Sequence, residues 1–196
     1  MENKFDQVVE KFQSLRGISK KTAQRLVMSL INNPSTLKEI DEGLMMIKTQ
    51  LDECSICFYL TIDGVCPICS DPHRDQNQVM VVASMMDAKI IEESKTFNGL
   101  YAILKGEIDL NKNITPDKLK IAELLRRIHQ DSELIFALNA TFNGELTANY
   151  LRDIARKKQV SYARLARGIP RGGILDYIDE QTLKEAIRNR HKSDEE

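Results

Sequence analysis

The sequence predicts an α/β protein built from several modules. Apolar residues recur at helical spacing through the first 52 residues, and all four cysteines lie between residues 54 and 69. After residue 76, short apolar runs alternate with amphipathic ones. We therefore expect a helical module over residues 1–52, a cysteine module over 53–75, a domain with a mostly parallel sheet over 76–168, and a C-terminal segment ending in a helix over 169–196.

The N-terminal module is expected to contain three helices. Residues 4–14 carry apolar side chains three and four positions apart, which predicts the first helix. Gly17 then permits a tight turn, and Ser19 is suited to cap the second helix. The pair Asn33-Pro34 ends that helix, and Ser35 is the expected cap of the third.

The glycine turn is surrounded by positive charge, although the whole chain has a net charge of only −1. No acidic residue occurs between Glu10 and Glu39, and four basic residues of this window cluster at the turn: Arg16, Lys20, Lys21 and Arg25. The first N–H groups of a helix also point toward anions. The pattern favours contact with a nucleic-acid phosphate without base reading. The alternative is an ordinary solvated helix face.

The cysteine module holds two Cys-x-x-Cys pairs, Cys54 with Cys57 and Cys66 with Cys69. No apolar run approaches the ~20 residues of a membrane span, and the N-terminus lacks a signal peptide's apolar core. We therefore expect a cytoplasmic protein with reduced thiols. Four thiolates can surround Zn²⁺ tetrahedrally at roughly 2.3 Å, with a turn at Asp63-Gly64. A thioredoxin-like redox pair needs only one such motif, so we favour a structural zinc site.

The rest of the chain alternates between the two kinds of element. Strands are expected at 79–83, 100–104, 133–138 and 160–166. Helices are expected at 86–95, from Thr115 with Pro116 in its first turn, at 144–158, and from Glu180 onward. This order implies right-handed crossovers and a mostly parallel sheet with helices on both faces.

A second window without acidic residues extends from Ile154 to Leu175. It contains six basic residues: Arg156, Lys157, Lys158, Arg164, Arg167 and Arg171. The first three complement the dipole at a helix end, whereas the last three follow that helix. We predict that these last three belong to a second surface for a polyanion.

Five segments together resemble the RecR family of bacterial recombination mediators, over nearly the whole chain. LRGISKKTAQRL (15–26) is similar to the family's helix–hairpin–helix motif, and the paired Cys-x-x-Cys resembles its zinc finger. NGLYAILKGEI (98–108) and NGELTANYL (143–151) resemble segments of its Toprim domain. ARLARGIPRGGILDYIDEQTL (163–183) resembles its C-terminal, Walker-B-like segment.

The resemblance implies a Toprim sheet between a DNA-gripping module and a C-terminal swapping element. It implies DNA contacts by Lys21 and Arg25, with Arg16 and Lys20 beside them, zinc on the four cysteines, and a partner contact at Glu145. It also implies a homodimer or a ring-shaped homotetramer that clamps DNA. The implied partners are RecO and RecF, and the implied role is loading RecA at single-stranded gaps in DNA repair.

The chain departs from the family pattern at several positions. Arg16 and Ser19 stand where the family usually has proline and glycine. Catalytic Toprim enzymes carry an acid after the first strand and an Asp-x-Asp after a later one. Here those positions read Ala83-Ser84 and Leu138-Asn139-Ala140, so we predict a scaffold that is not an enzyme.

Two alternatives remain open at the level of sequence. The first is a Mg²⁺-dependent Toprim nuclease or primase-like enzyme with Glu145, Asp176 and Asp179 as ligands. The second is a pure protein adaptor that has lost DNA binding because Ser19 replaces the hairpin glycine.

Overall fold

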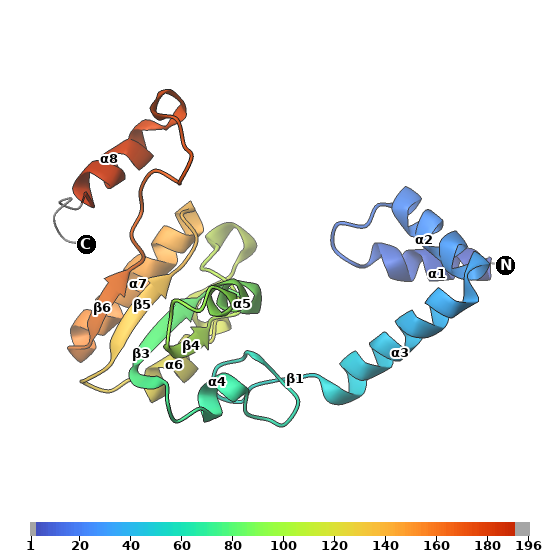
Figure 1. Cartoon of the computed structure of the whole chain (residues 1–196), viewed down its shortest axis with the longest axis horizontal. Coiled ribbons are helices and arrows are strands. Elements are labelled where there is room, and N and C mark those ends of the chain that lie inside the picture. The colour runs from blue at the N-terminus through green and yellow to red at the C-terminus, as the bar shows by residue number, and fades with distance from the viewer. Residues whose placement is uncertain (1–2, 191–196) are drawn as a thin grey trace. The chain divides into compact units, whose positions relative to one another are not determined.

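The structure, a computed structural model, describes residues 3–190, which divide into two compact units. The first unit ends at Asp52 and the second begins at Glu53 (Figure 1). The last six residues of the predicted C-terminal segment, 191–196, lie outside the described residues.

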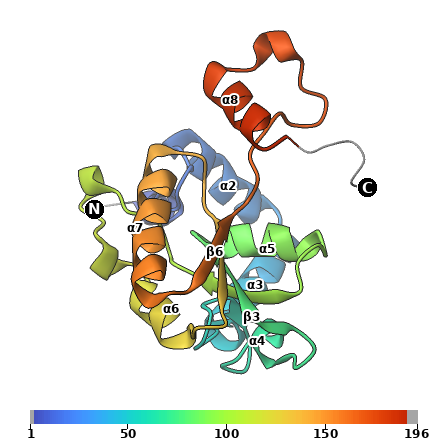
Figure 2. The ribbon, with the colours of Figure 1, turned by 90° about the vertical axis from the view of Figure 1, so that its left-hand side faces the viewer.

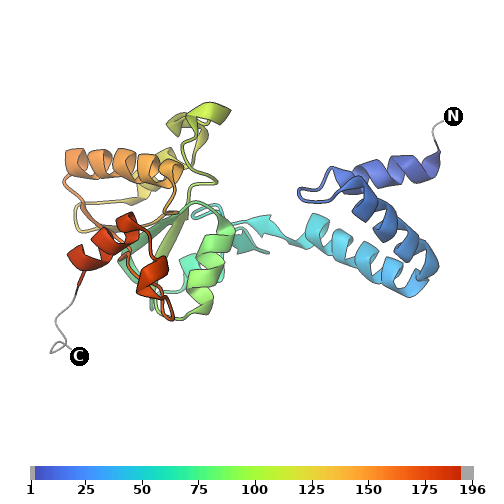
Figure 3. The same ribbon diagram turned by 90° about the horizontal axis from the view of Figure 1, so that it is seen from above.

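The first unit is a helical hairpin followed by a third helix (Figure 3). It contains α1 (Lys4–Gln13), α2 (Lys20–Asn32) and α3 (Pro34–Gln50). Its small core consists of Val9 from α1 with Ala23 and Val27 from α2. Gly17 takes φ +87°, which favours glycine, and the Thr22 N–H donates to Ser19 Oγ at 3.2 Å. The predicted turn and N-cap of α2 are therefore confirmed.

The predicted cap of α3 is wrong. Asn33 occupies the N-cap position and Pro34 is the first helical residue, so Ser35 lies inside the first turn. The Ser35 hydroxyl donates to Asn33 Oδ1 at 2.8 Å. The helix begins at proline because this residue has no N–H to satisfy and its φ is already helical.

The second unit is built around a four-stranded parallel sheet with the order β4-β3-β5-β6. The strands are β3 (Asp75–Val82), β4 (Gly99–Ile103), β5 (Glu133–Ala137) and β6 (Ser161–Arg164). The connecting helices are α5 (Met85–Glu93), α6 (Ile121–Arg127) and α7 (Phe142–Lys158). Figure 2 shows α6 and α7 on one side of the sheet and α5 on the other.

Each face of this sheet buries its own apolar cluster, because successive strand residues point to opposite sides. Val79 and Val81 of β3 pack with Leu124 of α6 and Leu151 of α7. Met80 and Val82 pack on the other face with Ala88 of α5, Tyr101 of β4 and three of the cysteines: Cys54, Cys57 and Cys66. The predicted α/β class, with a parallel sheet and helices on both faces, is confirmed.

The helix expected from Thr115 begins later than predicted. Pro116–Lys118 form a short 3-10 turn, η2, and α6 starts only at Ile121. The Lys120 N–H donates to the carbonyl oxygen of Leu104 at 3.0 Å, just beyond the end of β4. Leu119 is buried in an extended conformation beside this contact, which interrupts the helix.

The chain after β6 forms the 3-10 turn η3 (Leu175–Tyr177) and then α8 (Glu180–Arg188). Asp179 caps α8, since its carboxylate accepts from the Thr182 N–H at 2.9 Å. A further 3-10 turn, η1 (Leu110–Lys112), follows β4. No helix between residues 3 and 190 is both long and apolar enough to cross a bilayer.

Candidate metal centre and cationic helix turn

Short elements bring the four cysteines together. The strands β1 (Asp52–Glu53) and β2 (Leu60–Thr61) pair around the first Cys-x-x-Cys. The second pair lies at the start of α4 (Pro67–Ser70), with Cys66 as its N-cap. Gly64 takes φ +77° in the turn between the two pairs, where the sequence predicts a turn. The turn thus places the second Cys-x-x-Cys pair, or knuckle, next to the first.

The geometry of this cluster fits a metal ion. The four Sγ atoms all lie within 4.8 Å of one another, and those of Cys57 and Cys66 are 3.5 Å apart. A tetrahedral metal–thiolate site requires sulfur–sulfur separations of about 3.8 Å. All four cysteines are free of disulfides, and three of them are fully buried. Between residues 3 and 190, this is the only group of three or more cysteine, histidine or carboxylate side chains placed to hold a metal.

The surroundings of the cluster favour negative charge on one sulfur, that of Cys66, whereas the pKa values of Cys57 and Cys69 are raised. The N–H of Tyr59 donates to Cys57 Sγ and that of Cys69 donates to Cys66 Sγ, each at 3.4 Å. Hydrogen bonding from the Cys57 thiol lowers the pKa of Cys66 to about 2, and the same contact raises the pKa of Cys57. Amide donors and a shared proton stabilise a thiolate, which is the form that binds a metal.

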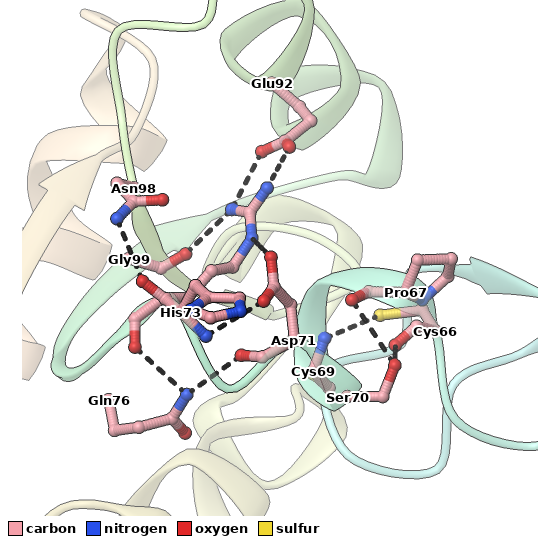
Figure 4. A network of polar contacts seen from close by, with 11 residues as sticks. Cys66, Pro67, Cys69, Ser70, Asp71, His73, Gln76, Glu92, Asn98 and Gly99 are labelled. Atoms are coloured by element: carbon pink, nitrogen blue, oxygen red, sulfur yellow. Dashed lines mark hydrogen bonds and ion pairs between the residues drawn. The ribbon is translucent and has the colours of Figure 1, made fainter.

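Arg74 fixes the second knuckle to the sheet domain. Its guanidinium donates to the carbonyl oxygen of Gly99 at 3.0 Å and forms an ion pair with Glu92 of α5. Its Nε also lies 4.0 Å from a carboxylate oxygen of Asp71, the C-cap residue of α4. Figure 4 shows Asp71, Glu92 and Gly99 converging beside the Cys66–Ser70 segment. Sequence reasoning missed Arg74, and its spacing of three residues from Asp71 was the only local signal.

The four predicted DNA-contact residues all lie at the hairpin turn of the first unit. Arg16 precedes Gly17, Lys20 and Lys21 begin α2, and Arg25 follows one turn later. All four side chains are exposed. Among residues 3–190, none of the four has an ion-pair partner, whereas Lys38 on α3 pairs with Glu42 at 3.8 Å. The turn therefore carries uncompensated positive charge, and its contact with DNA remains a prediction.

Glu145, the predicted partner-contact residue, is held by two arginines of the second basic window. Arg164 Nη1 donates to Glu145 Oε2 at 2.8 Å, and Arg167 forms an ion pair with the same carboxylate. Arg167 also lies 3.7 Å from Glu185 of α8. Burial alone would raise the pKa of Glu145, but the hydrogen bonds from these arginines lower it below its ordinary value. Arg164 and Arg167 are thus engaged by carboxylates, which corrects the prediction that these two offer free charge to a polyanion. The part of that prediction that concerns Arg171 stays a prediction.

The three acids of the alternative Mg²⁺ site are not grouped to hold one ion in the described structure, although Glu145 and Asp179 line one cavity. Glu145 is bound by arginines, Asp179 caps α8, and Asp176 lies in η3. At the end of the first sheet strand, Ser84 and Asp87 form a capping box at the start of α5. These contacts give the carboxylates structural roles at helix starts and in ion pairs.

The fold and the site define a protein with a Toprim domain and an attached four-cysteine module. Residues 77–166 match the Toprim domain family, and residues 168–191 match the family described as RecR, C-terminal. The chain is 39% identical over 188 residues to Recombination protein RecR of Thermosynechococcus vestitus, covering 94% of this chain and 93% of that protein. It is 37% identical over 188 residues to that of Clostridium perfringens, covering 95% of each. The chain belongs to the RecR family of recombination proteins, as the resemblance predicted.

Proposed function

We propose that this chain is a non-enzymatic mediator of DNA recombination. In this proposal it clamps DNA and, together with RecO and RecF, helps to load RecA at single-stranded gaps during repair. Membership of the RecR family supports the mediator role. The observation that carries the DNA contact is the uncompensated charge of the hairpin turn in the first unit.

The turn is built to meet a phosphate group. Lys21 and Arg25 lie four residues apart and so share one face of α2. The first N–H groups of the helix lack intrahelical partners and point toward the same end. Because such contacts involve only the backbone of the nucleic acid, they hold DNA of any sequence. This suits a protein that acts wherever a gap occurs.

Ser19 does not distort the hairpin, which argues against an adaptor that has lost DNA binding. Its backbone, at φ −74° and ψ 159°, is accessible to any residue, and only Gly17 in this turn takes a positive φ. The Ser19 hydroxyl lies 2.9 Å from that of Thr22, so it is folded back onto α2. Arg16 adds a cation where the family usually has proline.

We assign the metal as zinc, in a structural role. Four thiolates in a closed tetrahedral set are typical of structural zinc and leave no open coordination position for a substrate. Cys54, Cys57 and Cys66 are also part of the apolar cluster on one face of the sheet. The metal would therefore hold together part of the core of the second unit.

The engagement of Glu145 by Arg164 and Arg167 supports a role without catalysis. A carboxylate that ligates Mg²⁺ must offer oxygen lone pairs to the ion, and both oxygens of Glu145 face arginines. We expect no Mg²⁺-dependent cleavage or synthesis of DNA. Turnover that Glu145→Gln abolishes would instead favour the nuclease or primase-like alternative.

An apolar groove in the first unit supports assembly into a homodimer or a homotetrameric ring. The groove has a volume of about 510 Å³ and is lined by Phe5, Phe12, Ile31, Ile40 and Leu44, among others. All three helices of the unit contribute to it. Light scattering of the protein with and without a gapped duplex measures this assembly, and a monomer under both conditions would contradict the ring.

The DNA contact is tested by a double substitution, Lys21→Ala with Arg25→Ala, and fluorescence anisotropy on a gapped duplex. Log affinity falls with log salt, and each lost phosphate contact on duplex DNA makes this slope shallower by about 0.9. We expect the slope to fall by about two for each subunit that contacts the DNA, with an unchanged melting temperature.

The matched control is Lys38→Ala with Lys48→Ala, which removes the same two charges from α3 of the same unit. It should retain most of the wild-type affinity and slope. Equal binding by the two double variants would exclude the hairpin as the DNA grip. An absence of wild-type binding even at low salt would favour the adaptor.

A further inference from the structure

Arg127 lies where α6 ends and connects the first cysteine knuckle to the sheet. Its Nη1 donates to the carbonyl oxygen of Tyr101 in β4 at 2.9 Å and to that of Ile56 at 3.3 Å. Ile56 is the residue immediately before Cys57. The second terminal nitrogen, Nη2, is buried and has no hydrogen-bond partner in the described structure.

Arg127 also differs in charge balance from the other cations near the cysteine module. Three of them are paired with carboxylates: Arg74 with Asp71 and Glu92, Lys105 with Glu53, and Lys120 with Glu123. Among residues 3–190, no carboxylate lies within ion-pair distance of Arg127. A partly buried guanidinium without a counter-charge is costly, because its lost hydration is not replaced.

The metal centre has the opposite imbalance. Four thiolates and one divalent ion carry a net charge of −2, and three of the four cysteines are fully buried. A buried anion without a cation nearby is unstable for the same reason as a buried cation. Arg127 donates to the carbonyl oxygen of Ile56, which lies between Cys54 and Cys57. The segment between these two cysteines therefore links the unpaired cation to the negatively charged metal centre.

We propose that Arg127 is a positioning and charge-balancing residue of the metal centre. Its guanidinium holds the Cys54–Cys57 loop against β4, so that both thiolates stay in place for the ion, and its positive charge offsets the negative charge of the metal–thiolate complex. This inference rests on the proposed binding of a divalent metal by the four cysteines. It gives the metal centre a link to the sheet that is separate from the Arg74 ion pairs at the second knuckle.

The inference predicts the zinc affinities of a series of variants. Outer-shell partners of metal ligands are typically worth 10- to 100-fold in metal affinity. Arg127→Met keeps an unbranched stem but removes both charge and donors, so we expect a loss in that range. Arg127→Lys retains the charge and Arg127→Gln retains a donor, so each should recover part of the affinity. The measurement is competition for zinc between the folded protein and a chromophoric chelator at 25 °C.

Two controls separate this role from general stability. Arg126→Met removes the neighbouring, exposed arginine, and Leu124→Ala opens a cavity on the same helix in the cluster of the other sheet face. Leu124→Ala should lower the melting temperature, yet both controls should bind zinc as tightly as the wild type. If Arg127→Met binds zinc as tightly as the wild type, this inference is overturned while the metal assignment stands. The same holds if Arg127→Lys recovers none of the zinc affinity that Arg127→Met loses. A wild-type protein that binds no zinc would overturn the metal assignment with it.

Discussion

Removal of the metal tests how far the second unit depends on its cysteine module. Cys54, Cys57 and Cys66 are each 0% exposed and share an apolar cluster with residues of β3, β4 and α5. Without the ion, four thiols must repack or become hydrated inside that cluster. The perturbation is therefore applied to the core of the sheet domain and is not confined to a surface loop.

The expected magnitude is large. A structural zinc ion contributes roughly 10–16 kcal/mol of apparent binding free energy in small cysteine-rich sites, whereas a whole domain is stable by only about 5–15 kcal/mol. Even a net loss of about 5 kcal/mol would lower the melting temperature by roughly 10–20 °C in a unit of this size. The first unit buries Val9, Ala23 and Val27 in a separate core, so its helices should persist.

The chain offers a convenient optical assay for this prediction. It contains no tryptophan, and all five tyrosines lie beyond residue 52, so tyrosine fluorescence reports on the second unit alone. The metal is stripped with a high-affinity chelator, which leaves the thiols unmodified, and its release is followed with a colorimetric indicator. The tyrosine transition should move to lower temperature, and re-added zinc, but not Mg²⁺, should restore it. An unchanged transition after complete metal release would refute the structural role of the centre.

Two further predictions concern the edge of the sheet near Glu145. In Gly144→Ala the new Cβ would lie 2.0 Å from the carbonyl oxygen of Asn139, so we expect a loss of about 2–3 kcal/mol in urea denaturation. Gly43→Ala in α3, where nothing lies within 4 Å, is the matched control and should be neutral or slightly stabilising. The pKa of Glu145 is lowered in the folded protein, so its ion pairs contribute stability above the ordinary value of 4.5 and lose it as the pH falls through the folded pKa. Glu145→Gln should lack this part of the acid destabilisation, and parallel pH profiles of the two proteins would contradict the assignment.

Much of the fold was predictable because local patterns and the final structure agree. Gly17 and Ser19 shape the hairpin through their own backbone and side chain, without help from distant residues. The strands alternate their side chains between two buried faces, which produces the short apolar runs seen in the sequence. The cysteine pairs are also adjacent in sequence, so their convergence required only one turn.

The predictions from sequence are wrong or incomplete where contacts with a distant part of the chain override a local preference. Thr115-Pro116 is a good local start for a helix, yet the bond from the Lys120 N–H to Leu104 delays α6 until Ile121. Arg127 resembles the usual basic residue of a last helical turn, and only the fold shows that it contacts Ile56, 71 positions earlier. Neither contact has a signature in the nearby sequence.

The two acid-free windows show when a run of basic residues predicts free charge. In a helical hairpin most contacts are local, so a window without acids leaves Lys21 and Arg25 without partners among the described residues. In a parallel α/β sheet each crossover returns the chain beside a segment about twenty residues earlier. The α7 crossover brings Glu145 to Arg164, 19 positions away, and to Arg167. An acid-free window is therefore informative about a polyanion site when the surrounding contacts are local, and it is a weak guide when the fold returns an acid from outside the window.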